Sequence, residues 1–228
     1  MRAALVLAVG VSGLASMCIM GDPPPYRWSD PIDLFDGKTT NGWRGFREQP
    51  MAGWQVVDGA LTRVDKGPDI VTAREFADFD LLVEWKIAPG GNSGIFYRVT
   101  EEEPEMWMNA PEYQLIDDTG YHAPLKPVQK TGANYDLQAP APGSARKAGE
   151  WNTTLISVSN ARVVHSLNGV EVVRYYLWSD DWLELVSRSK FKDHPHYGRA
   201  RKGRIGLQNH GDWVALRTIR LREQLPRK

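Results

Sequence analysis

The chain has 228 residues, a length that suits one domain with a sizeable hydrophobic core. Lys and Arg total 28, and Asp and Glu also total 28, so the chain has no net field to attract nucleic acid or an anionic membrane surface. The expected partner is therefore uncharged. Nine residues are Trp, which fits stacking on sugar rings, although most of these side chains are expected in the core.

The first residues predict an export signal over 1–21, followed by a proline-containing linker over 22–30. One charge, at Arg2, precedes an uncharged run that ends at Met20. A membrane anchor is the alternative, because about 18 apolar residues is the lower limit for crossing a bilayer. Cys18, the single cysteine, suggests a lipidated residue attached to a membrane, but Met17 interrupts the usual lipoprotein pattern. The expected location is extracytoplasmic, either periplasmic or membrane-anchored as a lipoprotein.

Residues 31–228 read as one all-β domain. Short β-branched and aromatic runs alternate with Gly, Asn, Asp and Pro, which predicts an antiparallel sandwich or barrel. Asp58-Gly59 and Asn168-Gly169 supply the positive φ angles that two-residue hairpin turns need. Further strands are expected at 79–87, 94–99, 112–117, 152–158, 204–209 and 213–221.

One short helix is predicted after Ser179. That serine and two following acids form a favourable N-terminus, and Arg188 and Lys190 lie at the cationic end. We expect the helix to pack over an edge of the sandwich. Two long irregular stretches, 100–111 and 118–149, are expected to rim a cleft, because loops of this length in a compact domain are usually functional or mobile.

The stretch 89–98, Pro-Gly-Gly-Asn-Ser-Gly-Ile-Phe-Tyr-Arg, is the most informative local feature. Its three glycines permit a close approach of the backbone between two extended segments. By itself the stretch fits a plain hairpin turn as well as a site-building one. It is one of eight segments that occur in a recognisable order: 34–38 with 42–43, 54–61, 90–95, 112–117, 149–152, 165–169, 189–191 and 206–211.

Together these eight segments resemble the 3-keto-disaccharide hydrolase family. The resemblance implies a concanavalin-like jelly roll, a two-sheet antiparallel sandwich. It also implies an enzyme that acts on glycosides, including disaccharides, whose sugar ring carries a ketone at C3. The expected partner is thus a carbohydrate substrate.

Strand alternation predicts one concave surface that collects polar side chains from several strands. Its expected members are Glu84, Arg98, Glu112, Gln114, Gln208, His210 and Arg217. Asn92, Ser93 and Tyr97 of the glycine-rich stretch are further candidate substrate-binding residues. Taken singly, each charged residue fits a solvated sheet face or a structural ion pair, and only the whole cluster favours a site.

Cleavage of a 3-ketoglycoside needs a base, an oxyanion stabiliser and an acid. The ketone acidifies the C2 hydrogen, and once a base removes it the ring electrons expel the C1 substituent. Glu112 is the expected base, with Glu84 second. Arg98, or the amides around Asn92 and Ser93, are expected to hold the enolate oxygen. His210 is expected to protonate the leaving group or to bind a metal.

The other histidines have simpler interpretations, and no cofactor is predicted. His165 alternates with apolar residues, which indicates a core position although the family shows a histidine there. His194-Pro195-His196 indicates a surface turn. No His and carboxylate set in the sequence has the spacing of metal ligands. A divalent ion bound by residues that are distant in sequence but close in the fold stays an open alternative. Because the chain lacks a dinucleotide motif, a separate sugar 3-dehydrogenase is expected to form the ketone.

Two alternative functions stay open at this stage. Glu84 and Glu112 could form the carboxylate pair of an ordinary glycosidase, although the Glu-x-Asp-x-x-Glu pattern of jelly-roll glucanases is absent. The same fold also serves non-catalytic lectin-like modules. A buried carboxylate with a perturbed pKa would favour an enzyme over a lectin.

Overall fold

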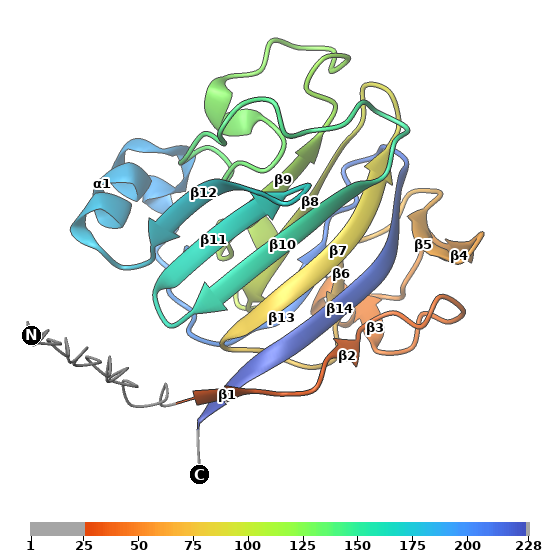
Figure 1. The fold of residues 1–228 in the computed structure, drawn as a ribbon, viewed down its shortest axis with the longest axis horizontal. Helices are drawn as coiled ribbons and strands as arrows, with labels where there is room; N and C mark the ends of the chain where they lie inside the picture. Colours follow the sequence, from red (N-terminus) through yellow and green to blue (C-terminus); the bar gives the residue numbers. More distant parts are fainter. Residues whose placement is uncertain (1–25, 227–228) are drawn as a thin grey trace, which may run out of the picture.

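The computed structural model describes residues 26–226, and within them the strands form two antiparallel sheets. Figure 1 shows the larger sheet in front of the smaller one. This arrangement confirms the predicted all-β, two-sheet sandwich with one short helix. The expected leader and Cys18 lie outside the described residues. None of the helices described there is long and apolar enough to cross a bilayer.

The larger sheet has nine strands in the described part of the chain, and the smaller has five. In order, the larger sheet contains β12 (Val170–Tyr176), β11 (Arg162–Leu167), β10 (Asn152–Ser159), β7 (Phe79–Ile87), β14 (Val214–Pro226), β5 (Ala60–Arg63) and β4 (Trp54–Val57), with β1 (Tyr26–Trp28) and β2 (Ile32–Asp33) pairing β14. The smaller sheet contains β3 (Trp43–Gly45), β6 (Ile70–Thr72), β13 (Arg204–Leu207), β8 (Asn92–Val99) and β9 (Glu112–Ile116). β1 includes residues 26–28 of the stretch expected as a linker.

The core lies between the two sheets because each strand directs its apolar side chains to one face. In β7, buried residues alternate with partly exposed ones over all nine positions, as expected for a strand with one buried face. Trp85 of β7 is 1% exposed, and its Nε1 donates a hydrogen bond to Thr154 Oγ1 at 2.9 Å. Tyr113 and Leu115 of β9 face the same core from the smaller sheet.

Both predicted tight hairpins are present. β4 and β5 are joined by Asp58-Gly59, and β11 and β12 by Asn168-Gly169. Asn168 has φ 50° and Gly169 φ 86°, so both central residues of this turn are in the left-handed region that suits the twist of a two-residue hairpin.

Two irregularities change which face a side chain reaches. Arg98 has φ 55°, and the register of β8 against β13 shifts beside it. Thr218 has φ 51°, and the register of β14 against β7 shifts between Arg217 and Ile219. Bulges of this kind break the strict alternation of side chains along a strand. Any prediction of shared faces that counts through these positions is therefore wrong.

The predicted helix is α1 (Asp180–Arg188). Ser179 Oγ accepts a hydrogen bond from Trp182 N–H at 3.2 Å, the contact expected of an N-cap serine. Trp182 stacks on Tyr175 of β12, with ring centroids 5.2 Å apart, which confirms that the helix packs at a sheet edge. Three single-turn 3₁₀ helices, η1 (Phe46–Glu48), η2 (Met106–Met108) and η3 (Pro127–Gln129), lie in loops, and a fourth, η4 (Lys190–Asp193), directly follows α1.

Candidate active site

The glycine-rich stretch builds the floor of a site on the outer face of the smaller sheet. Gly94 of β8 pairs with Gln114 of β9, and the next pair on the same face of the sheet is Phe96 with Glu112. The Glu112 side chain lies across Gly94, so a Cβ at that position would collide with its carboxylate. Glycine is needed here for the close approach of a functional side chain, as the sequence suggested.

A cavity of about 190 Å³ opens above this floor. It brings together side chains from the smaller sheet, from both long loops and from the segment after α1. Its lining residues are Asn92, Trp107, Glu112, Gln114, Tyr135, Lys190, Gln208 and His210. Five of these eight were predicted as site residues, and the predicted role of the long loops as rims is confirmed by Trp107 and Tyr135.

Glu112 is the carboxyl group of this cavity, and its pKa is strongly perturbed. It is 4% exposed, and burial raises its pKa to about 8; the nearby Asp69 charge also raises it, while the Lys190 charge opposes the shift. In the amide orientation that satisfies its surroundings, Gln114 donates to Glu112 Oε1 and to the Ser93 carbonyl, both at 3.1 Å. Gln114 therefore holds one carboxylate oxygen of a residue that lines the cavity.

Lys190, which the sequence indicated only as the cationic end of a helix, is the cation of the site. Its Nζ lies 4.4 Å from the Tyr135 ring centroid, 4.9 Å from that of Trp107 and 5.1 Å from that of Phe191. These ring faces favour the charged ammonium through cation–π interactions. Partial desolvation lowers the pKa of Lys190, and the charge of Glu112 counteracts this effect.

The opposite wall is rich in amide groups. Gln208 N–H donates to the Gly94 carbonyl at 3.0 Å, which continues the pairing of β13 with β8 beyond the strand end. Gln208 Oε1 is buried and accepts no hydrogen bond from any described residue. A buried acceptor without a partner is costly, so it suits a ligand hydroxyl or amide. Asn92 and His210 line the same cavity, and the His210 side chain is exposed.

Glu84 and Arg217 do not belong to this site, so the prediction of one surface with all seven polar residues is wrong. They are paired across β7 and β14 of the larger sheet, on its solvent face. Glu84 Oε1 lies 3.4 Å from Arg217 Nη2, and Thr218 Oγ1 donates to Glu84 Oε2 at 2.7 Å. The bulge at Thr218 places Arg217 outside and Ile219 inside, whereas simple alternation assigned them to one face.

Arg98, Tyr97 and Ser93 also lie outside the cavity. The backbone turn at Arg98 directs its guanidinium to Asp78 Oδ1 at 2.9 Å and to the Asn160 carbonyl at 2.9 Å, so it forms a buried structural ion pair. Tyr97 points into the core and hydrogen-bonds with His165. Ser93 Oγ donates to the Gln208 carbonyl at 2.9 Å, beneath the cavity.

His165 is a core histidine, as its alternation with apolar residues indicated. It is fully buried, its Nε2 lies 3.0 Å from Tyr97 Oη and its Nδ1 lies 3.0 Å from the Gly132 carbonyl oxygen. Burial lowers its pKa to about 4, which keeps the ring neutral. Among residues 26–226, no group of three His, Cys, Asp or Glu side chains is arranged to hold a metal ion.

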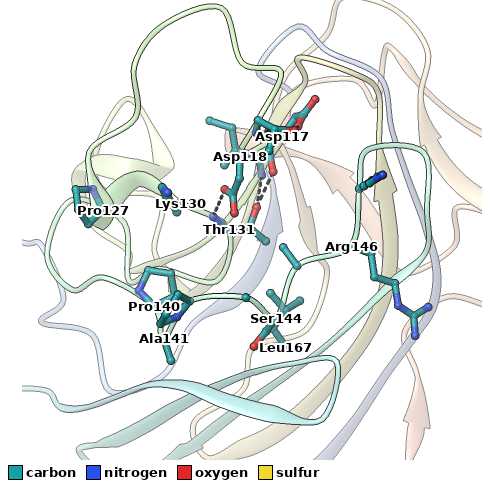
Figure 2. A pocket seen from close by; sticks show the side chains of 16 residues that line it. Asp117, Asp118, Pro127, Lys130, Thr131, Pro140, Ala141, Ser144, Arg146 and Leu167 are labelled. Carbon is teal, nitrogen blue, oxygen red and sulfur yellow. Dashed lines mark hydrogen bonds between the residues drawn. The ribbon is translucent and has the colours of Figure 1, made fainter.

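A different cavity, of about 310 Å³, lies where loops 117–119, 127–131 and 140–147 meet (Figure 2). Its carboxylates are engaged by the protein: Asp118 Oδ1 accepts from Thr131 N–H at 2.8 Å, and Asp117 accepts from three backbone N–H groups. Burial raises the pKa of Asp117, but these hydrogen bonds outweigh it and hold the pKa below its usual range. Because backbone N–H groups hold Asp117 and Thr131 N–H holds Asp118, the Glu112 cavity is the better candidate.

Comparison with known proteins places the chain in a family and agrees with the observed fold. A family model described as a 3-keto-alpha-glucoside-1,2-lyase-like domain matches residues 30–222. The chain belongs to this family. A 3-keto-disaccharide hydrolase of Bacteroides thetaiotaomicron is 34% identical to it, over 84% of this chain and 77% of the relative.

Solved structures of related proteins support a glycoside-cleaving family and the fold. A candidate glycosyl hydrolase from Parabacteroides distasonis shares 33% identity and a TM-score of 0.81, over 85% of this chain and 93% of that one. Winged bean acidic lectin, at 11% identity and a TM-score of 0.50, covers 89% of this chain and 100% of that one and shows the jelly-roll fold alone. The chain thus belongs to a family of glycoside-cleaving enzymes built on a lectin-like fold.

Three residues that line the Glu112 cavity were missed from the sequence: Trp107, Tyr135 and Lys190. Lys190 did leave a signal, because Ser189-Lys190-Phe191 is one of the eight segments that carry the family resemblance. Trp107 and Tyr135 lie in the two long loops, where no periodic pattern indicates which side chain faces a cavity.

Proposed function

We propose that the protein cleaves the glycosidic bond of 3-keto-glycosides, including 3-keto-disaccharides, by acid–base chemistry at C2 and C1. The observation that carries this proposal is the buried Glu112 carboxyl, with a pKa of about 8, in one cavity with the Lys190 cation. A base of this pKa suits removal of a hydrogen made acidic by a neighbouring ketone. A fixed cation suits the enolate that this step produces.

In the first step, the Glu112 carboxylate takes the C2 proton, and the C–H electron pair forms an enolate whose charge rests on the C3 oxygen. Lys190 stabilises this oxyanion, a role that the sequence suggested for Arg98 or for the amides around Asn92 and Ser93. The enolate then expels the C1 substituent, and the leaving oxygen takes a proton from His210. Gln208 and Asn92 bind ring hydroxyls, with Gln208 Oε1 accepting one of them.

In the second half, water adds to C1 of the unsaturated ketone. Its proton restores His210, and Glu112 returns a proton to C2, so the net reaction is hydrolysis. If the unsaturated ketone leaves before water adds, the same residues perform an elimination. The two outcomes therefore differ only in the last step.

The alternatives find less support in this geometry. A Glu84–Glu112 carboxylate pair would have to flank one bond, yet these residues lie on different sheets. A lectin site does not require a desolvated carboxyl group in the same cavity as a lysine surrounded by aromatic rings. The acid–base cleavage reaction uses both groups.

The proposal includes the cellular setting expected from the sequence. A separate sugar 3-dehydrogenase supplies the ketone, because the cleavage chemistry itself changes no oxidation state at C3. Residues 1–21 direct export to the periplasm, with lipidation of Cys18 as the membrane-attached form. Cell fractionation of the native chain and of Cys18→Ser checks the last point, because loss of membrane association in the variant is expected for a lipoprotein.

The direct test is incubation of the purified protein with a 3-keto-disaccharide and with its unoxidised parent, with and without a chelator. We expect release of the second sugar from the keto compound and none from the parent. Cleavage of the parent alone would overturn the proposal. The chelator arm determines whether a divalent ion participates.

A further inference from the structure

A further cavity, of about 380 Å³, lies on the same outer face of the smaller sheet as the Glu112 cavity. The Glu112 cavity is called the first cavity below, and this one the second. Two segments line both cavities. Pro104 and Glu105 line the second and Trp107 the first, while Asn209 lines the second and its two neighbours, Gln208 and His210, line the first. The two cavities are therefore neighbours, because adjacent residues of the same two segments line them.

The electrostatics also indicate a short separation. The charge of Asp69, in the second cavity, is one of the influences that raise the pKa of Glu112 in the first. The Coulomb interaction between two charges weakens with distance, so this influence indicates that Asp69 and Glu112 lie in the same region of the molecule. A ligand that extends out of the first cavity past Asn209 thus enters the second.

The second cavity has the chemistry of a neutral-sugar site. Asp69, Glu105 and Gln49 supply hydrogen-bond acceptors, and the buried Phe46 supplies an apolar wall. Asp69 Oδ1 accepts from Asn209 N–H at 2.8 Å, and its other oxygen has no partner among the described residues. No Lys or Arg lines this cavity. Hydroxyl groups are therefore favoured as ligands, and anionic groups are disfavoured by the two carboxylates.

Asn209 is a rigid divider between the cavities. Its Oδ1 accepts from Arg63 Nε at 2.7 Å, and its Nδ2 donates to the Asp65 carbonyl at 3.2 Å. The first cavity, at about 190 Å³, is smaller than the ~300–1,000 Å³ typical of sites for drug-sized ligands, so it suits one sugar ring. A second ring needs the adjoining space.

We propose that the second cavity binds the sugar that leaves, and that Asp69 and Glu105 make it selective for uncharged sugars over uronic acids. The inference rests on the proposed cleavage of 3-keto-glycosides and adds to it the class of the leaving group. The preferred substrate is accordingly a 3-keto-disaccharide whose second ring carries no carboxylate.

The test compares kcat/KM for three 3-keto-glucosides: one with a methyl aglycone, one with glucose and one with glucuronate. We expect kcat/KM for the glucose compound to be about tenfold higher than for the methyl compound. We also expect it to be about tenfold higher than for the glucuronate compound. Glu105→Lys should raise the glucuronate-to-glucose ratio at least tenfold. Glu102→Lys is the matched control, because it makes the same charge change at an exposed residue of the same loop that does not line the cavity.

Equal kcat/KM values for all three compounds, or an unchanged ratio in Glu105→Lys, would overturn the inference while leaving the proposed function intact. Binding of free glucose and glucuronate, followed by saturation-transfer NMR, gives a readout that does not depend on turnover. The wild-type protein should favour glucose, and Glu105→Lys should shift the preference toward glucuronate. Indifference to the charge of the sugar in both proteins would contradict the second cavity as a leaving-sugar site.

Discussion

At the scale of single residues, the account depends on one buried carboxyl group. Glu112→Gln should fold normally and lose turnover of a 3-keto-glucoside by at least ~10²-fold, the lower range for a general base. Glu84→Gln is the matched control, because its carboxyl lies on the solvent face of the other sheet in an exposed ion pair worth ~0–1 kcal/mol. Steady-state kinetics of both variants measure the difference, and equal losses would remove Glu112 from its role.

The buried Glu112 carboxyl also gives the stability of the wild-type protein a defined pH dependence, which Glu112→Gln removes. Folding raises the pKa of Glu112 from 4.5 to about 8, so the folded state keeps a proton that the unfolded state releases. This stabilisation is complete below pH 4.5 and is lost as the pH rises through 8. Because Gln does not ionise, the Tm of Glu112→Gln should fall less than that of the wild type between pH 5 and pH 9 in thermal melts. Parallel Tm curves would contradict the buried acid.

Lys190 affects both the rate and the pH profile. As an ionised base, Glu112 should give a kcat/KM that rises with pH through about 8. The Lys190 charge lowers the pKa of Glu112, so Lys190→Met should move this rise to higher pH and reduce kcat by ~10²–10³, the loss typical for one oxyanion donor. Lys190→Arg, which retains the charge, should keep the rise near its original pH. A purely structural role of Lys190 would change the rate without moving the pH profile.

Gly94 is the residue that makes room for the base. Gly94→Ala should destabilise the protein and abolish turnover, because the added methyl group would collide with the Glu112 carboxylate. In a double-mutant cycle, Glu112→Ala should relieve most of this destabilisation by removing the carboxylate. Denaturant unfolding of the four proteins measures the coupling. Simple additivity of the two effects would show that the two residues are not in contact.

At the scale of elements, α1 and η4 position Lys190 in the cavity on the smaller sheet. Two serines make equivalent hydrogen bonds at the two ends of α1. Ser179 Oγ accepts from Trp182 N–H at 3.2 Å, and Ser189 Oγ accepts from Phe191 N–H at 3.1 Å and donates to the Val186 carbonyl at 2.9 Å. The second serine directly precedes Lys190.

Replacing each serine by Ala should cost about 1 kcal/mol of stability, the usual value for an N-cap. Ser189→Ala should also lower kcat several-fold, because it loosens the turn that positions Lys190, whereas Ser179→Ala should leave kcat near the wild-type value. Thermal melts and kinetics of the pair separate the two effects. Equal kcat values would show that η4 geometry does not control the cation.

At the scale of the whole molecule, the sequence predicts the sandwich well because the sandwich depends on alternation and turns. The β7 pattern, both hairpins and the Ser179 cap are local signals, and all are confirmed. Glu112, Gln114, Gln208, Asn92 and His210 were brought together as expected, because no bulge intervenes between them and the glycine-rich stretch.

The remaining errors have identifiable physical causes. Glu84 and Arg217 were assigned to the site because alternation alone does not reveal which of two sheets a strand joins. Arg98 was assigned to it because the positive φ at that position is not visible in the residue type. Lys190, Trp107 and Tyr135 reach the cavity from loops or from the end of a helix, and only the tertiary fold brings these distant segments together.

The most direct measurement of the central claim is the isotope content of the product formed in D₂O. Glu112 is proposed to exchange the C2 proton during cleavage, so early 3-keto-glucose formed by the wild-type protein should carry deuterium at C2 by NMR. A parallel sample of free 3-keto-glucose corrects for slow spontaneous exchange. Hydrogen retained at C2, together with an unchanged rate for substrate that carries deuterium at C2, would contradict proton abstraction and with it the assigned role of Glu112.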